Sequence, residues 1–201
     1  ALPIGAYSVR ELPADVLVFP KETSHWNPAL PVGCASARRK MQFQQLYPEA
    51  VIQPVRGNVL TRLEKLDSGE HGALILAEAG LKRLGLSDRI AYRFSPEELV
   101  PAAGQGILAI QTRAGEYADL LARLNSPDGA LCAKTERQLA SLLGGDCSAP
   151  VGCHAQLHGT DMTLYGFSGI GGVPRYGSVQ GNRNDADLLV QQLASKLTIT
   201  E

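Results

Sequence analysis

The chain has 201 residues, 44% of them hydrophobic, and a formal net charge of −1, which suits one large or two small domains with a packed core. The net charge gives no argument for nucleic acid or membrane binding, no apolar run reaches the roughly 18 residues of a membrane span, and no signal peptide is visible at the start. Four cysteines are too few for a disulfide-stapled secreted domain, so we expect reduced thiols in a cytoplasmic protein.

Short apolar runs alternate with helical patterns over the first part of the chain. Strands are predicted at 16–19, near 32–33, near 51–52 and at 73–77. Helices are predicted at about 35–47, at 58–69 with Asn58 as N-cap and Gly69 as C-cap, and around 81–84. This alternation predicts an α/β unit with a largely parallel sheet.

The pattern changes after a linker at 96–100. An apolar strand is predicted at 107–110, followed by helices at about 115–125 and 129–143. Segments 154–158, 162–167 and 175–179 are typical of an antiparallel meander, and Asn184 is expected to cap a final helix. Residues from about 145 to 201 should therefore form a small α+β domain with a three-stranded antiparallel sheet.

Basic residues gather between residues 35 and 95, which hold ten Lys or Arg and six Asp or Glu. Arg38 and Arg39 lie in the first turn of a predicted helix, and Arg56 and Arg62 flank the start of the next. Cations there oppose the helix dipole, whereas free N–H groups at helix starts bind anions, so the pattern indicates an anionic ligand. Arginine forks suit carboxylates, and open α/β sheets bind ligands at the carboxyl ends of their strands.

We therefore expect a site for a multiply carboxylated small molecule. A solvated basic face with surface ion pairs is the alternative that the pattern alone leaves open. Nucleic acid is disfavoured, because only 5% of residues are aromatic and they do not interleave with the basic run.

Five short motifs, in order between residues 32 and 155, carry a resemblance. Residues 56–63 (RGNVLTRL), 77–85 (AEAGLKRLG) and 101–106 (PAAGQG) resemble signatures of the hydroxymethylbilane synthases, also called porphobilinogen deaminases. Glu136-Arg137, ahead of Gly145-Asp146-Cys147, and the following Pro150-Val151-Gly152 are similar to two more.

The resemblance implies a fold and a division into domains. The expected fold is a periplasmic-binding-protein-like (type II) α/β domain with a mostly parallel sheet, plus the small α+β C-terminal domain. Residues 1–14 would be a hinge and a remnant of domain 1, and residues 15–97 the cofactor- and substrate-binding domain 2. Residues 98–126 would return a strand and a helix to domain 1, and residues 127–201 would form domain 3 with the cofactor cysteine.

The resemblance also implies an activity. The family joins four porphobilinogen units head to tail, with loss of ammonia, into hydroxymethylbilane, on a dipyrromethane primer held by a thioether to one cysteine. Cys147 matches that cysteine, and a thiolate suits such an attachment. The acetate and propionate groups of the pyrroles would explain the arginines. The implied contacts to cofactor and growing chain are Ser36, Arg38, Arg39, Arg56, Arg62, Arg83 and Gln105.

The sequence also departs from the family pattern. Cys34 and Ala35 replace two hydroxyl residues, and the family's Lys-Asp pair, whose aspartate handles the pyrrole nitrogen and the departing ammonia, is absent. Glu11 and Asp15 lie in a different motif context, so we assign the catalytic role to no residue of this chain. Residues 101–114 resemble the strand that returns to domain 1, so this strand would lack most of its sheet, and an exposed sheet edge invites pairing or aggregation.

The expected partners are porphobilinogen and the growing polypyrrole, with neither nucleic acid nor membrane, and we expect a monomer when the protein is complete. A trimmed chain, a partner that supplies the N-terminal portion, and a diverged protein without catalysis remain open explanations. A non-catalytic binding module for a polycarboxylated small molecule would need the arginines but not Cys147. A zinc site from Cys147, Cys153, His154 and His158 lacks the usual paired spacing, so we predict no metal.

Overall fold

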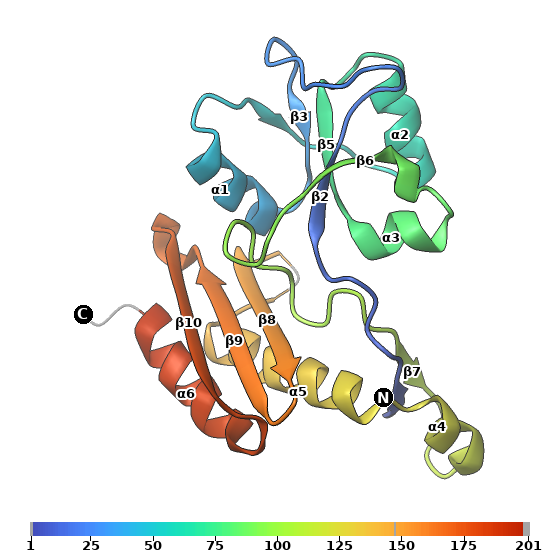
Figure 1. Cartoon of the computed structure of the whole chain (residues 1–201), viewed down its shortest axis with the longest axis vertical. Helices are drawn as coiled ribbons and strands as arrows, with labels where there is room; N and C mark the ends of the chain where they lie inside the picture. The colour runs from blue at the N-terminus through green and yellow to red at the C-terminus, as the bar shows by residue number, and fades with distance from the viewer. Residues whose placement is uncertain (1, 147, 199–201) are drawn as a thin grey trace.

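The computed structural model describes residues 2–146 and 148–198, and arranges their strands in three groups (Figure 1). The largest is a five-stranded sheet in the order β4-β3-β5-β2-β6. Its strands are β2 (Asp15–Val18), β3 (Val32–Gly33), β4 (Ile52–Gln53), β5 (Ala73–Ala77) and β6 (Ile90–Arg93).

This sheet is mixed. Strand β3 is parallel to β4 and β5, whereas β2 is antiparallel to both β5 and β6. The expectation of a mostly parallel sheet is therefore not confirmed. The reason is that β2 enters from the hinge against the direction of β5, and β6 returns toward the hinge beside β2.

Helices cover both faces of the five-stranded sheet. Helix α1 (Ala37–Leu46) packs on one face, and α2 (Val59–Asp67) and α3 (Glu78–Arg83) pack on the other. Side chains alternate along β2 between these layers, because Leu17 joins the cluster under α1 while Val16 and Val18 join the cluster under α2 and α3. This layering buries β2 completely.

The predicted N-cap of α2 is confirmed, whereas the C-cap is Ser68, one residue before the predicted Gly69. The side chain of Asn58 accepts a hydrogen bond from the backbone N–H of Thr61 at 2.9 Å. Gly69 follows the last helical turn with φ +86°, a left-handed conformation that glycine adopts without strain.

The predicted three-stranded antiparallel sheet is also confirmed. It consists of β8 (Val151–His158), β9 (Asp161–Ser168) and β10 (Arg175–Asn182), with α5 (Pro127–Leu142) and α6 (Ala186–Leu197) packed on one face. Asn184, however, does not cap α6. It lies in a preceding 3₁₀ turn, where its backbone N–H donates to the side chain of Asn182 at 2.9 Å.

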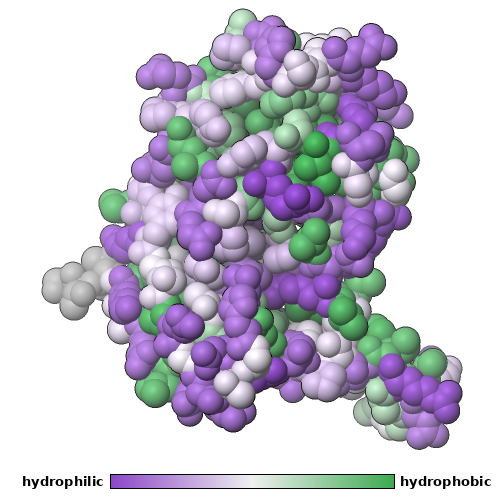
Figure 2. Space-filling model, in the orientation of Figure 1, coloured by the Kyte–Doolittle hydropathy of each residue, from purple (hydrophilic) through white to green (hydrophobic). Residues whose placement is uncertain are grey.

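A two-stranded ribbon extends away from both sheets. It pairs β1 (Ile4–Tyr7) with β7 (Ala109–Gln111), and α4 (Ala118–Leu124) lies beside it (Figure 1). The expected strand at 107–110 begins two residues later, because Ile107 packs against the core of the C-terminal part instead. No residue of α4 is buried, and apolar side chains are exposed on this lobe (Figure 2).

Two hinge segments connect the ribbon to the five-stranded sheet. Residues 8–14 lead into β2, and residues 99–108 lead back, joined by backbone hydrogen bonds such as Glu11 N–H to Gly106 O at 3.1 Å. Among the described helices, none has the length and apolar character needed to cross a membrane.

Candidate functional site

The predicted arginines follow strands that end at the same edge of the five-stranded sheet. The parallel strands β3, β4 and β5 end at Gly33, Gln53 and Ala77, and α1, Arg56 and α3 follow these ends. Asp15, which begins the antiparallel strand β2, pairs with Ala77 in the register. The carboxyl edge of the sheet therefore combines the arginines with one carboxylate, and it faces the hinge.

Arg38 and Arg39 both bind Asp15. The Nη1 atom of Arg38 lies 2.6 Å from Oδ2 of Asp15, and it also donates to the carbonyl oxygen of Val100 at 2.7 Å. The Nε atom of Arg39 donates to Oδ1 of Asp15 at 2.8 Å, and its Nη2 lies 2.7 Å from the same oxygen. Asp15 is fully buried, while Arg38 is 4% exposed.

Asp15 remains charged in this environment. Burial alone would raise the pKa of its carboxyl group, but the charges and hydrogen bonds of Arg38 and Arg39 outweigh that effect and lower the pKa. Sequence reasoning gave Asp15 no role, although a charged residue that opens the apolar run Val16–Phe19 was a usable signal.

Gln105 joins this network from the hinge. Its Nε2 donates to Oδ1 of Asp15 at 3.0 Å and to the carbonyl oxygen of Pro13 at 2.5 Å. Its Oε1 lies 3.4 Å from Arg38 Nη2. Arg83 Nη2 donates to the carbonyl oxygen of the neighbouring Gly106 at 3.0 Å. The structure thus brings the predicted residues Arg38, Arg39, Arg83 and Gln105 together at one hinge segment.

Arg56 and Arg62 remain available at the start of α2. Arg62 Nε donates to the carbonyl oxygen of Gly57 at 2.8 Å, and Arg56 is exposed. Within residues 2–146 and 148–198, neither guanidinium forms an ion pair with a carboxylate. Ser36 caps α1, since its hydroxyl oxygen accepts from Arg39 N–H at 3.4 Å. It therefore shapes the helix start that presents the arginines.

Cys147, the predicted attachment residue, lies outside the described residues. On its C-terminal side, the backbone N–H groups of Ser148 and Ala149 donate to the Asp146 carboxylate at 2.7 and 2.8 Å. Gly169 N–H donates to Pro150 O at 2.9 Å, and a side chain at Gly169 would overlap the sulfur of Met41 in α1. Gly169, which is hydrogen-bonded to Pro150, therefore lies against α1, the helix that carries Arg38 and Arg39.

The other three cysteines are free and buried, at Cys34, Cys132 and Cys153. Burial raises the pKa of each thiol, so these side chains are poor nucleophiles. In the part of the chain that the structure describes, no three His, Cys, Asp or Glu side chains are grouped to hold a metal ion.

A second buried ion pair lies on the other side of the hinge, and sequence reasoning did not identify it. Arg10 Nη1 and Nη2 lie 2.6 and 2.8 Å from the two oxygens of Glu136, which is fully buried in α5. Glu136 also accepts backbone N–H bonds from Gly104 at 2.6 Å and Ala155 at 2.7 Å. This cluster joins the hinge to the C-terminal part.

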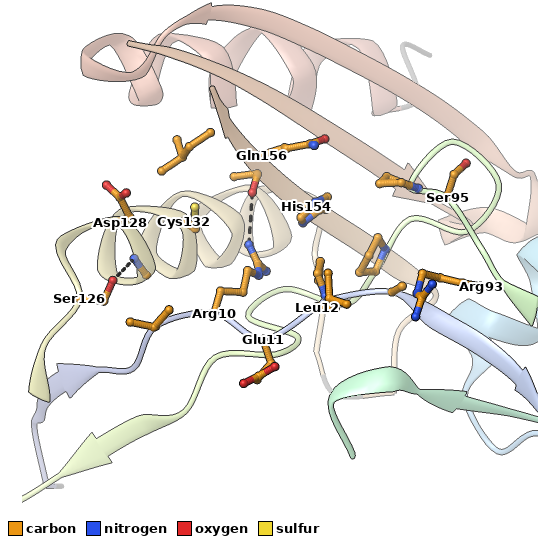
Figure 3. Close-up of a pocket in the computed structure, with 18 of the residues that line it drawn as sticks. Arg10, Glu11, Leu12, Arg93, Ser95, Ser126, Asp128, Cys132, His154 and Gln156 are labelled. Atoms are coloured by element: carbon orange, nitrogen blue, oxygen red, sulfur yellow. Dashed lines mark hydrogen bonds between the residues drawn. The ribbon is translucent and has the colours of Figure 1, made fainter. Parts of the chain in front are cut away.

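A cavity of about 740 Å³ lies beside Arg10, between the hinge, the start of α5 and β8 (Figure 3). Its two arginines already have partners, because Arg10 binds Glu136 and Arg93 binds Glu78 at 2.5 Å. The carboxyl edge of the five-stranded sheet, where Arg56 and Arg62 have no carboxylate partner among the described residues, is the better candidate for a carboxylated ligand.

Fold and site together define a two-part α/β and α+β protein with an arginine-rich sheet edge at its hinge. Two family descriptions match the chain: "Porphobilinogen deaminase, dipyromethane cofactor binding domain" over residues 1–119, and "Porphobilinogen deaminase, C-terminal domain" over residues 130–198. The chain belongs to the porphobilinogen deaminase family.

Curated relatives agree with this assignment. Porphobilinogen deaminase of Acetivibrio thermocellus is 44% identical over 201 residues, covering 98% of this chain and 68% of the relative. The enzyme of Alkaliphilus oremlandii is 46% identical over 166 residues, covering 83% of this chain and 56% of the relative. That of Thiobacillus denitrificans is 43% identical, covering 94% and 63%. The chain thus spans between about half and two thirds of the length of these relatives.

One solved structure also overlays on the chain, an arginine-specific periplasmic binding protein of Salmonella typhimurium. The TM-score is 0.34 at 20% identity, over 64% of this chain and 63% of that protein.

Proposed function

We propose that this chain holds a dipyrromethane cofactor by a thioether at Cys147 and takes part in the stepwise condensation of four porphobilinogen units to hydroxymethylbilane. The observation that carries the proposal is the clustering of Arg38, Arg39, Arg83 and Gln105 at one sheet edge, with Arg56 following β4 at that edge. Membership of the family and the match to its cofactor-binding domain support it.

The donor set at this edge fits the cofactor. Pyrroles with acetate and propionate groups present several carboxylates, and guanidinium groups bind carboxylates with two parallel hydrogen bonds. Arg56 and Arg62 have no carboxylate partner among the described residues, so both guanidinium groups can accept a carboxylate from a ligand.

The chain's own residues would bind and orient the ligands. Arg39, Arg56, Arg62 and Arg83 would hold carboxylates of the cofactor and of the incoming porphobilinogen, and Gln105 would hold the hinge next to them. When bound, the dipyrromethane supplies the pyrrole end to which each unit is added with loss of ammonia.

Asp15 does not fit the role of acid or base at the pyrrole nitrogen. Both of its oxygens are bound to Arg38, Arg39 and Gln105, and its side chain has no exposed surface. A group that transfers protons must reach the reacting atoms. We therefore assign proton transfer to no residue of this chain.

We further propose that residues 15–97 act as the cofactor- and substrate-binding domain in a type II binding-protein arrangement. Residues 98–126 would return to the first domain, and residues 127–201 would carry the cofactor cysteine. The separate cores on either side of the hinge support this division. The exposed apolar side chains of α4 support a covering polypeptide on the ribbon, which would be the portion of the relatives that this chain does not match.

The test is the intact mass of the purified chain after incubation with porphobilinogen. We expect an excess of two linked pyrrole units on the wild type and on Cys132→Ser, and no excess on Cys147→Ser. An excess that persists on Cys147→Ser would contradict the attachment site. A wild type that binds porphobilinogen reversibly and gains no mass would favour the non-catalytic binding module.

A further inference from the structure

Asp15 has an unusual position for a carboxylate. It opens an apolar strand, it is fully buried, and it pairs with Ala77 at the edge where the arginines gather. A buried charge needs partners, and Asp15 has Arg38, Arg39 and Gln105. It is therefore a fixed anion placed inside a site for anions.

The two arginines that bind Asp15 are not equivalent. Arg38 has 4% of its side chain exposed, and its Nη1 is shared between Asp15 and the carbonyl oxygen of Val100. Arg39 has 13% exposed, and only its Nε and Nη2 face Asp15 and Gln105. Its Nη1 makes no hydrogen bond to any described residue, so one edge of this guanidinium is open to a ligand.

We propose that Asp15 is a positioning residue, which fixes the guanidinium of Arg39 so that its open edge meets a carboxylate of the pyrrole ligand. The proposal rests on the proposed function for the identity of that ligand. An arginine side chain has many rotamers, and holding it in the bound orientation before the ligand arrives removes an entropic penalty of binding. Asp15, at the start of β2, and Gln105, in the hinge segment 99–108, provide that restraint from two parts of the chain that are distant in sequence.

The change in porphobilinogen affinity caused by Asp15→Asn has opposite signs for a positioning role and for a purely electrostatic role of Asp15. Removing an anion next to two arginines should, by charge alone, tighten the binding of a dicarboxylate such as porphobilinogen. If Asp15 orients Arg39, Asp15→Asn should instead weaken binding roughly tenfold, as expected when a charge-assisted hydrogen bond is misaligned. Unchanged or tighter binding in calorimetric titration with porphobilinogen would overturn the proposal.

A matched control lies in the same sheet domain. Asp67 also pairs with an arginine, Arg89, at 2.7 Å, but at the end of α2. Asp67→Asn should leave porphobilinogen affinity unchanged.

A double-mutant cycle shows whether Asp15 acts through Arg39. In an Arg39→Gln background, Asp15→Asn should cause no further loss of affinity, because the side chain that it orients is gone. A second tenfold loss in that background would show a general structural effect and overturn the proposal. If Asp15→Asn alone does not fold, the Arg38→Met variant is compared with the Arg38→Met, Asp15→Asn double variant. In the double variant one buried cation and one buried anion are removed together.

A measurement on the ligand-free protein tests the positioning of Arg39 independently of the proposed cofactor and substrate. The Nε–H resonance of Arg39, assigned by its absence in Arg39→Gln, should be protected from solvent exchange in the wild type and lose that protection in Asp15→Asn. Equal exchange in both proteins would overturn the positioning role. A wild type that neither binds porphobilinogen nor gains mass, yet shows this difference, would remove the proposed function and leave the positioning of Arg39 intact.

Discussion

Glu136 is a fully buried carboxylate with a hydrogen-bonded arginine on one side and two backbone N–H groups on the other. Its removal would leave Arg10, which is 14% exposed, without its counter-charge. We expect Glu136→Gln to lower the free energy of unfolding by about 3–5 kcal/mol, as for other broken buried pairs. Urea denaturation measures this change.

Glu116→Gln is the control, because Glu116 pairs with Arg113 at the surface at 3.4 Å. Exposed pairs contribute about 0–1 kcal/mol, so this variant should resemble the wild type. Equal effects of the two substitutions would show that Arg10 and Glu136 do not stabilise the hinge.

The same carboxylate predicts a pH dependence. Burial alone would raise the pKa of Glu136, but the neighbouring His154 imidazole, 3.6 Å away, and the hydrogen bonds and charge of Arg10 lower it in the folded state. Its contribution is therefore complete above the unfolded value of 4.5 and is lost as the pH falls toward the folded pKa. Glu136→Gln should flatten this acid limb of the stability curve.

At the scale of single residues, the sequence predicts the arginine cluster of the site but not the carboxylate that binds it. The clustering of Arg38, Arg39 and Arg83 could be predicted, because each follows a strand that ends at one edge of the sheet. The partner of the arginine pair could not, because Asp15 meets Arg38 only through the antiparallel register of β2 with β5. Contacts across such a register are absent from local sequence patterns.

The two hinge segments lie in contact at Gly106, whose carbonyl oxygen accepts from Glu11 N–H at 3.1 Å. Gly106 has φ +89°, and a Cβ there would overlap the carbonyl oxygen of Glu11 in the other segment. Gly104 has a similar φ of +75° but no atom within 4 Å of its Cβ position. The two glycines thus form a matched pair, which differs mainly in the space available.

We expect Gly104→Ala to cost about 1–2 kcal/mol of unfolding free energy, from the left-handed backbone alone. Gly106→Ala should cost about 1–3 kcal/mol more, because the methyl group must separate the two segments. Thermal and urea denaturation of both variants measure the difference. Equal losses would mean that the segments do not touch as described.

The sequence predicts most of the helices and strands, but it does not predict the direction of β2 within the five-stranded sheet. The N-cap at Asn58 and the left-handed Gly69, which follows the C-cap Ser68, depend on neighbours within a few residues, so the sequence predicts this helix end to within one residue. Whether β2 runs parallel or antiparallel depends on where the chain enters the sheet. That entry point lies in the hinge, and the hinge is held by residues from 100–106, distant in sequence.

Across the molecule, buried apolar contacts are distributed unevenly. One cluster joins α5 and α6 to the three-stranded sheet, and two others cover the faces of the five-stranded sheet. None of these three clusters includes a side chain from β1, β7 or α4. A two-stranded ribbon without such a core is marginally stable by itself, so this lobe should open without global unfolding.

Hydrogen exchange measures that difference directly. We expect amides of β1, β7 and α4 to exchange at least roughly 100-fold faster than those of β9 and α6. Leu193 is fully buried in the C-terminal core, and Leu193→Ala should lower global stability by about 2–5 kcal/mol. Exchange in β9 should then accelerate while exchange in the ribbon stays unchanged, because the ribbon opens by a local route. Equal protection of ribbon and β9 in the wild type would contradict this hierarchy and would place the ribbon in the cooperative core.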